Sequence, residues 1–247
     1  MTVMAESMPS LQIQTEDLLK WGKLWKATVN PETNKAKESG ALDRQQSVRF
    51  AKTVDRAFAD SLAAMLGGVP VVETDSRALV PSSGNCVEMG AVRVIGGVRP
   101  QNFDVAYRPD GLRVAFDSKT LNDRKSIGKN WQNMINDLAT EATTVHTRFP
   151  YAVVAFVVLL PRPALVIQQE LDIVRTLERL GTRRTVLNQA QLAEAISLVI
   201  WDPDTGLIDA ASPSPTSPLR IDRFPETFYP RYVERYKGLP PHNVSED

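Results

Sequence analysis

The feature that most constrains the fold is an unbroken apolar run at residues 151–160, which reads YAVVAFVVLL. A strand with one face in water alternates apolar and polar residues, whereas a continuous run is typical of a strand buried on both faces of a sheet. The run is too short to cross a bilayer as a helix. We therefore expect an α/β protein whose sheet carries helices on both faces.

Two amphipathic helices are predicted on either side of the central part of the chain. Apolar residues recur every three or four positions over residues 43–66, and Gly67-Gly68 follows as a stop signal. The same spacing extends over residues 128–146, where Phe149-Pro150 ends the pattern. Weaker patterns predict a helix at 165–180, a short helix near 189–195 and a strand at 198–201.

A β-hairpin is predicted between these helices. Residues 103–107 and 112–119 are β-rich segments that flank Arg-Pro-Asp-Gly at 108–111, a sequence typical of a turn. Residues 69–73 and 86–95 are further extended candidates. The order from residue 43 to 160 is then helix, strand, strand, strand, helix, strand, which favours a mixed sheet with helices packed on its faces.

The ends of the chain have different patterns, although the length suits one domain overall. Residues 1–42 are predicted to form a helical arm that carries Trp21 and Trp25. Residues 43–211 would form the core with C-terminal additions. Residues 212–247 begin with the proline-rich Ser212 to Pro218 and continue as an aromatic tail, for which packing or dimerisation is favoured.

Composition excludes several classes of function. Lys and Arg number 29, as do Asp and Glu, so attraction to a polyanion must come from a local patch. A single cysteine, Cys86, with two histidines rules out an internal disulfide and a Cys/His zinc site within one chain. The first residues lack the pattern of a secretory signal, so we expect no membrane association and a cytoplasmic location.

The predicted hairpin brings together two acids and a lysine. Asp104 lies on its first strand, and Asp117 and Lys119 lie two residues apart on the second, so their side chains leave the same face. Carboxylates from neighbouring strands suit a hard divalent cation such as Mg²⁺, which also takes phosphate oxygens as ligands. The alternative interpretation is an exposed hairpin face with ordinary cross-strand ion pairs.

These residues resemble the motif of the restriction-endonuclease-like PD-(D/E)XK nucleases over residues 43–160. The resemblance implies that Asp104 and Asp117 bind Mg²⁺ and that Lys119 positions or activates the attacking water. Asn102-Phe103 stands where proline precedes the first acid in the literal motif, and Ser118 stands where many members have an apolar residue. Many members take a further acidic ligand from the first helix or an early strand. The candidates are Asp55, Asp60, Glu73 and Glu88, of which Glu88 is slightly preferred.

Several side chains are candidates for contacts with DNA. Residues 99–129 hold seven Lys or Arg against four Asp, which suits a phosphate backbone. Arg124, Lys125, Lys129 and Gln132 follow the motif directly. Base recognition would come from loops and from residues 166–247. The candidates there are Arg183, Arg184, Asn188 and Gln189.

The resulting hypothesis is a Mg²⁺-dependent endonuclease that hydrolyses double-stranded DNA. The resemblance favours a type II restriction enzyme, which would act as a homodimer because one site per chain must cut two strands. The alternatives are a less specific defence or repair nuclease of the same fold and a non-catalytic module for nucleic-acid binding or assembly.

Overall fold

A computed structural model describes residues 3–74, 78–81 and 83–242 of the chain. Its helices are α1 (Thr15–Lys26), α2 (Arg44–Met65), α3 (Ile127–His146), α4 (Ile167–Leu180) and α5 (Phe224–Tyr236), with short 3₁₀ turns at Arg162–Ala164 and Ile221–Arg223. Its strands are β1 (Val71–Glu73), β2 (Val87–Ile95), β3 (Pro100–Tyr107), β4 (Val114–Thr120), β5 (Val153–Pro161) and β6 (Ala195–Trp201).

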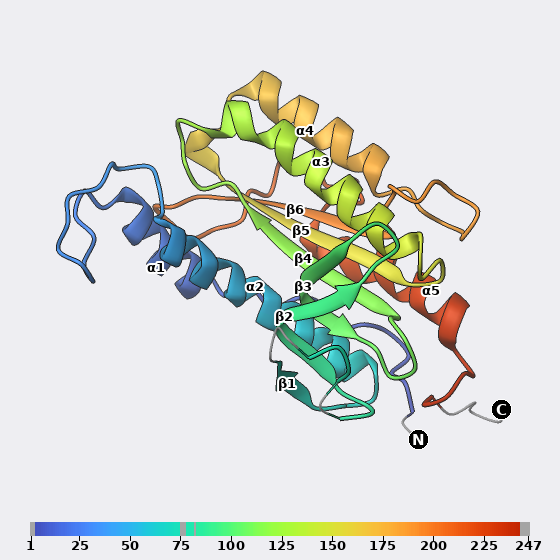
Figure 1. Ribbon diagram of the computed structural model, residues 1–247. Coiled ribbons are helices and arrows are strands. Elements are labelled where there is room, and N and C mark those ends of the chain that lie inside the picture. Colours follow the sequence, from blue (N-terminus) through green and yellow to red (C-terminus); the bar gives the residue numbers. More distant parts are fainter. Residues whose placement is uncertain (1–2, 75–77, 82, 243–247) are drawn as a thin grey trace.

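All six strands form one sheet in the order β1-β2-β3-β4-β5-β6. Strands β2, β3 and β4 are antiparallel, whereas β4, β5 and β6 run parallel, and β1 is parallel to β2. Helices α3 and α4 cover one face of the sheet, and α1, α2 and α5 lie on the other (Figure 1). The expectation of an α/β fold with a mixed sheet flanked by helices is confirmed.

Strand β5 is the centre of the core, as its apolar sequence predicts. It lies between β4 and β6, and every one of its residues is buried. Helices on both faces exclude water from its side chains, so an alternating polar residue would have no solvent to reach. Among the described residues, no helix is long and apolar enough to cross a membrane.

Helix α2 begins at a capping box and packs on β4 through an aromatic contact. The Asp43 side chain accepts a hydrogen bond from the Gln46 amide, and the Gln46 side chain bonds back to Asp43, so both ends of this capping box are made. In the second half of the helix, Phe58 stacks on Phe116 of β4 with ring centroids 3.9 Å apart. This contact sets which turn of α2 faces the second half of β4.

The chain around residue 194 differs from its sequence pattern. The short helix expected at 189–195 is wrong, because turns lead directly into β6 at Ala195. The Ala193 amide donates to the Leu180 carbonyl, and the Glu194 amide donates to Val154 of β5. These bonds to neighbouring elements take the amides that a local helix would use, so pairing with the sheet prevails over local propensity.

The two ends of the chain belong to the same hydrophobic core as the sheet. The proline-rich segment does not act as a free linker, since Ser217 Oγ donates to Glu178 and the Leu219 carbonyl accepts from the Leu198 amide. Of the tail aromatics, Phe224, Phe228 and Tyr232 are fully buried. Packing, one of the two roles expected for the tail, is confirmed, and the N-terminal arm also buries Trp21 and Trp25.

We expect Phe58→Ala to reduce the free energy of unfolding by about 3–5 kcal/mol, because it leaves a cavity against Phe116. Urea denaturation followed by circular dichroism measures the change. Val48→Ala is the matched control on the same helix, since the Val48 side chain is exposed and its loss should cost little. Equal effects of the two substitutions would contradict the packing described here.

Candidate functional site

The hairpin strands separate where the two motif acids lie. Pairing between β3 and β4 extends from Tyr107 and Val114 to Val105 and Phe116 and stops there. On its other side, β4 stays paired with β5 from Val114 to Thr120. Asp104 and Asp117 would be the next pair in this register. They therefore lie where β3 and β4 have separated, while β4 is still held by its pairing with β5.

A carboxylate fills the place of the missing backbone bond. Asp104 Oδ2 accepts hydrogen bonds from the Ser118 amide at 3.0 Å and from Ser118 Oγ at 3.4 Å. The single proton of the Ser118 hydroxyl is directed mainly at Asp55 Oδ1 of α2, which lies 2.6 Å from Oγ. Phe58 and Asp55 lie three residues apart on one face of the helix. They contact Phe116 and Ser118, which lie two residues apart on one face of the strand. The packing of Phe58 on Phe116 therefore places Asp55 beside Ser118.

A cavity of about 540 Å³ opens beside these residues, and its lining includes Lys52, Asp55, Glu73, Asp104, Asp117 and Ser118. Its wall on the side of β2 is a β-bulge between Met89 and Val92. Within the bulge, Gly90 has φ of 109°, a backbone conformation that side-chain-bearing residues rarely adopt. The bulge interrupts the pairing of β2 with β3 next to Asp104, so Asp104 faces open space on this side as well.

The carboxyls at the site repel one another. Burial raises the pKa of Asp104 to about 8, together with a hydrogen bond to Asp117 and the charge of that residue. Burial also raises the pKa of Asp117 to about 6, although the bond with Asp104 and the charge of Lys119 oppose the rise. Burial and the charge of Asp104 raise the pKa of Asp55. A group of acids in this state attracts protons or a cation.

Lys119 supplies the positive charge of the site. Its Nζ donates to Asp117 Oδ2 and, at 2.9 Å, to Glu141 Oε1 of α3. Burial opposes the charge on this amine, but the two carboxylates prevail and raise its pKa. The side chain is 23% exposed, so the ammonium is partly open to solvent. The predicted grouping of Asp104, Asp117 and Lys119 is thus formed.

The arrangement suits a cation that needs few protein ligands. Within the described part of the chain, no three Asp, Glu, His or Cys side chains lie close enough to hold a metal ion together. Mg²⁺ usually binds through one or two carboxylates and completes its shell with water and phosphate oxygens. Asp104 and Asp117 provide such a pair of oxygen donors, and burial is the main cause of their raised pKa values, although Lys119 is paired with Asp117.

The structure reverses the preference among the candidates for a further acid. Both oxygens of Glu88 accept hydrogen bonds from Arg108, and this buried pair is not part of the cavity lining. Asp60 is exposed and pairs with Arg56. Asp55 and Glu73 line the cavity, and Asp55 is bonded to Ser118. Asp55 therefore replaces Glu88 as the acid beside the motif residues, but it does not complete a three-acid metal site, because the described residues contain no such group.

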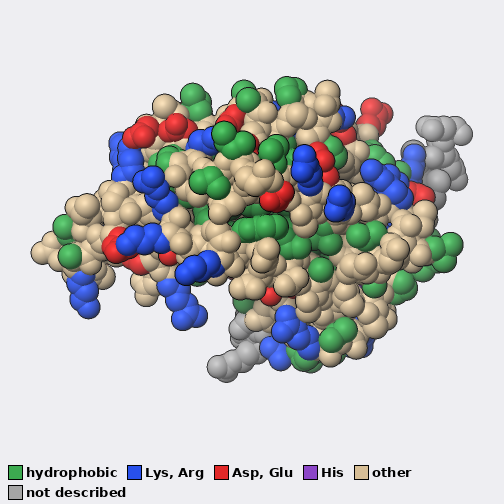
Figure 2. Space-filling view, turned by 90° about the horizontal axis from the view of Figure 1, so that it is seen from above, with side chains coloured by type: hydrophobic (Ala, Val, Ile, Leu, Met, Phe, Trp, Pro, Cys, Tyr) green, Lys and Arg blue, Asp and Glu red, His purple; other side chains and the backbone are tan. Residues whose placement is uncertain are grey.

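The side chains predicted to contact DNA after the motif are all exposed: Arg124, Lys125, Lys129 and Gln132. Lys125 pairs with Glu38, and the Arg124 amide donates to the Gly40 carbonyl, so the N-terminal arm holds this loop in place. In Figure 2, Lys and Arg side chains lie on either side of the face shown, with hydrophobic side chains and some Asp and Glu between them. Because the net charge of the chain is zero, any excess of positive charge at this surface must be local.

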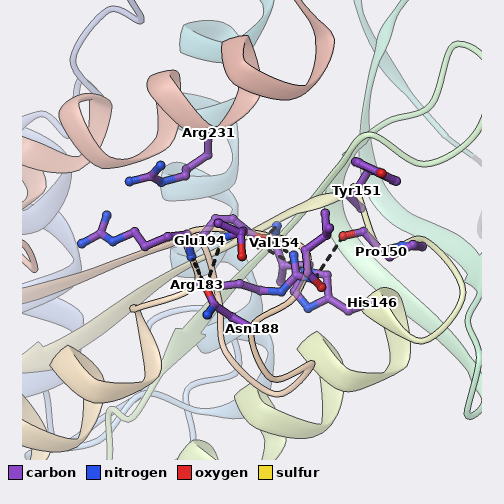
Figure 3. A network of polar contacts seen from close by, with 12 residues as sticks. His146, Pro150, Tyr151, Val154, Arg183, Asn188, Glu194 and Arg231 are labelled. Carbon is purple, nitrogen blue, oxygen red and sulfur yellow. Dashed lines mark hydrogen bonds and ion pairs between the residues drawn. The ribbon is translucent and has the colours of Figure 1, made fainter.

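Arg183 has a different role from the one predicted. It is 1% exposed and donates to Glu194 Oε1 at 2.6 Å, which makes contact with DNA impossible in this conformation. Figure 3 shows Glu194 surrounded by Arg183, His146 and Val154, and Arg235 also pairs with it. The guanidinium is a structural counter-charge for a buried carboxylate. Of the neighbouring candidates, Arg184, Asn188 and Gln189 are exposed.

Sequence reasoning missed Glu141 and ranked Asp55 too low. The same sequence feature could have identified both residues. Each is an acid within an apolar helical stripe. Glu141 stands between Leu138 and Val145 on the buried face of α3, and Asp55 follows Ala51 by one turn on α2. A charged residue at a core position is rarely buried without a partner, so such positions mark a polar site.

Comparison of the chain with protein-family models, with curated proteins and with solved structures gives no significant match. The function must therefore be argued from the residues described above.

The raised pKa values predict how stability depends on pH in the absence of metal. Carboxyls with folded-state pKa values above 3.8 stabilise the fold only while protonated, so the free energy of unfolding should fall as pH rises from 3.8 towards 8. Asp104→Asn removes one of these charges. We expect it to flatten this dependence and to raise Tm at pH 8, by about 2–4 °C for each kcal/mol gained.

Thermal unfolding in EDTA at several pH values measures this effect. Asp137→Asn, at an exposed position of α3, is the matched control and should follow the wild-type curve. An Asp104→Asn variant that is less stable than wild type at pH 8 would show that the bonds from Ser118 outweigh the repulsion.

Proposed function

We propose that this chain is a Mg²⁺-dependent endonuclease that hydrolyses phosphodiester bonds of double-stranded DNA. The observation that carries the proposal is the convergence of Asp104, Asp117 and Lys119 at the point where β3 and β4 separate. Two oxygen donors for a hard cation line a cavity large enough for part of a nucleotide chain, and the Lys119 ammonium is bonded to one of these donors, Asp117.

The order of the elements supports the same proposal. Helix α2 is followed by the antiparallel strands β2, β3 and β4, then by α3 and by β5 parallel to β4. This is the helix, three strands, helix, strand order on which the resemblance to PD-(D/E)XK nucleases rests. The short strand β1, between α2 and β2, is an addition at the edge of the sheet.

The residues of the site have distinct roles in this proposal. When bound, Mg²⁺ would lower the pKa of a water ligand and neutralise charge on the phosphate. Asp104 and Asp117 would hold it, and the Ser118 amide fixes the orientation of Asp104. Lys119 Nζ presents a positive charge to the developing negative charge on the phosphate oxygens. Hydrolysis by this route needs no covalent intermediate on the protein.

The exposed basic side chains after β4 would contact the DNA backbone. Arg124, Lys125 and Lys129 follow Lys119 within one loop and the first turn of α3, so they suit phosphates adjacent to the one that is cut. One site per chain cuts one strand, so double-strand cleavage calls for a homodimer. We propose sequence-specific cleavage of the type II restriction class, with base contacts from outside the core.

Plasmid cleavage tests the proposal directly. We expect supercoiled plasmid to be cut with Mg²⁺ and to stay intact with EDTA. Asp117→Ala should lower the cleavage rate by about 100-fold or more, because it removes a metal ligand and a partner of Lys119. Asp137→Ala, on the exposed side of α3, is the matched control and should cut like wild type.

The pattern of products separates the versions of the proposal. Discrete fragments would support a restriction enzyme, and a smear would favour a less specific nuclease. Intact plasmid with Mg²⁺ or Mn²⁺, together with a Tm that neither ion raises, would contradict a metal-dependent nuclease and favour a binding module.

A further inference from the structure

Glu141 of α3 is the second carboxylate bonded to Lys119. Its side chain is 5% exposed, and its Oε1 accepts from Lys119 Nζ at 2.9 Å and from Gln101 Nε2 at 3.1 Å. Around it on the same helix face are Leu138, Ala142 and Val145, all fully buried. An apolar residue would fill this position without the cost of burying a charge.

The charge of Glu141 has a single counter-charge. Lys119 is the cation with which it pairs among the described residues, because Gln101 is a neutral donor. Glu141 Oε2 is buried, and no described residue donates a hydrogen bond to it. The electrostatic attraction of this carboxylate is therefore directed at the ammonium group.

Lys119 lies between two carboxylates that differ in position. Asp117 also faces Asp104 and lines the cavity, whereas Glu141 does not belong to the cavity lining. In the proposed nuclease, the charge of Asp117 is shared with the cation that it holds. Glu141 is then the one of the two carboxylates bonded to Lys119 that does not also bind the cation.

We propose that Glu141 is a positioning residue, which holds the Lys119 ammonium in place beside the scissile phosphate. It acts through Lys119 and touches neither the cation nor the substrate. The inference rests on the proposed nuclease activity and assigns a role to a residue outside the recognised motif. A flexible lysine with four rotatable bonds would otherwise spread its charge over many positions, and part of its effect on the transition state would be lost.

Two substitutions test this role. Glu141→Leu completes the apolar stripe of α3, and Glu141→Gln keeps the shape of the side chain without its charge. A purely structural role predicts loss of stability in both variants. The positioning role predicts that Tm changes little, because Lys119 is partly exposed and keeps Asp117 as its counter-charge, so neither variant leaves an unpaired buried charge.

Cleavage kinetics provide the second readout. We expect kcat for plasmid cleavage to fall by about 10–100-fold in both variants, with KM for the plasmid unchanged, because DNA binding does not depend on the orientation of Lys119. The rise in Tm that Mg²⁺ produces should also be unchanged, since Asp104 and Asp117 are intact. Glu178→Gln is the matched control. Glu178 lies on the neighbouring helix α4, and its half-buried carboxylate accepts a hydrogen bond from Ser217.

The outcomes separate this inference from the proposed function. Wild-type kcat in both Glu141 variants, alongside an inactive Asp117→Ala variant, would overturn the role of Glu141 and leave the nuclease proposal standing. A matching loss of kcat and Tm would also overturn it and assign Glu141 to the fold. An inactive wild-type protein whose Tm does not respond to Mg²⁺ would overturn both.

Discussion

The site depends on the unequal support that β4 receives from its two neighbours. Strand β5 pairs with β4 from Val114 to Thr120, whereas β3 pairs with it only as far as Phe116. The first half of β4 therefore has a partner strand on each side, whereas the second half is paired only with β5. A polar group placed there has an unpaired backbone amide beside it and a rigid strand beneath it, and Asp104 uses that amide.

Burying several carboxyls in one place costs stability, and the rest of the molecule offsets this cost. The acids in β3, in β4 and on α2 have raised pKa values because burial and like charge act in the same direction. A fully apolar β5 and the aromatic packing of Phe58, Phe116, Phe224 and Phe228 provide the opposing hydrophobic term. Such strain is common where a site awaits a charged ligand.

Much of the architecture could be predicted because its signals are local. The apolar run at β5, the apolar residues at every third or fourth position of α2 and α3, and the Pro-Asp-Gly turn each identify an element from neighbouring residues. Asp104, Asp117 and Lys119 could be grouped because strand periodicity within one hairpin settles which side chains meet. Asp55, Glu141 and the pairing of Arg183 with Glu194 depend on contacts between distant segments, so an alternating or helical pattern does not rank them. The helix prediction for the segment before β6 was wrong for the same reason, since the hydrogen-bond partners of its backbone come from other elements.

The order of the strands has a consequence for synthesis. Every strand lies beside the strands that precede and follow it in the chain, so the sheet can grow one strand at a time as the polypeptide leaves the ribosome. Helix α5 breaks this local order, because Phe224 and Phe228 pack edge-on against Phe58 of α2. Phe58 therefore lacks part of its aromatic packing until the last helix emerges. Asp55, Asp104 and Asp117 all precede α5 in the chain, so the acids of the site can come together on a nascent chain before its aromatic core is complete.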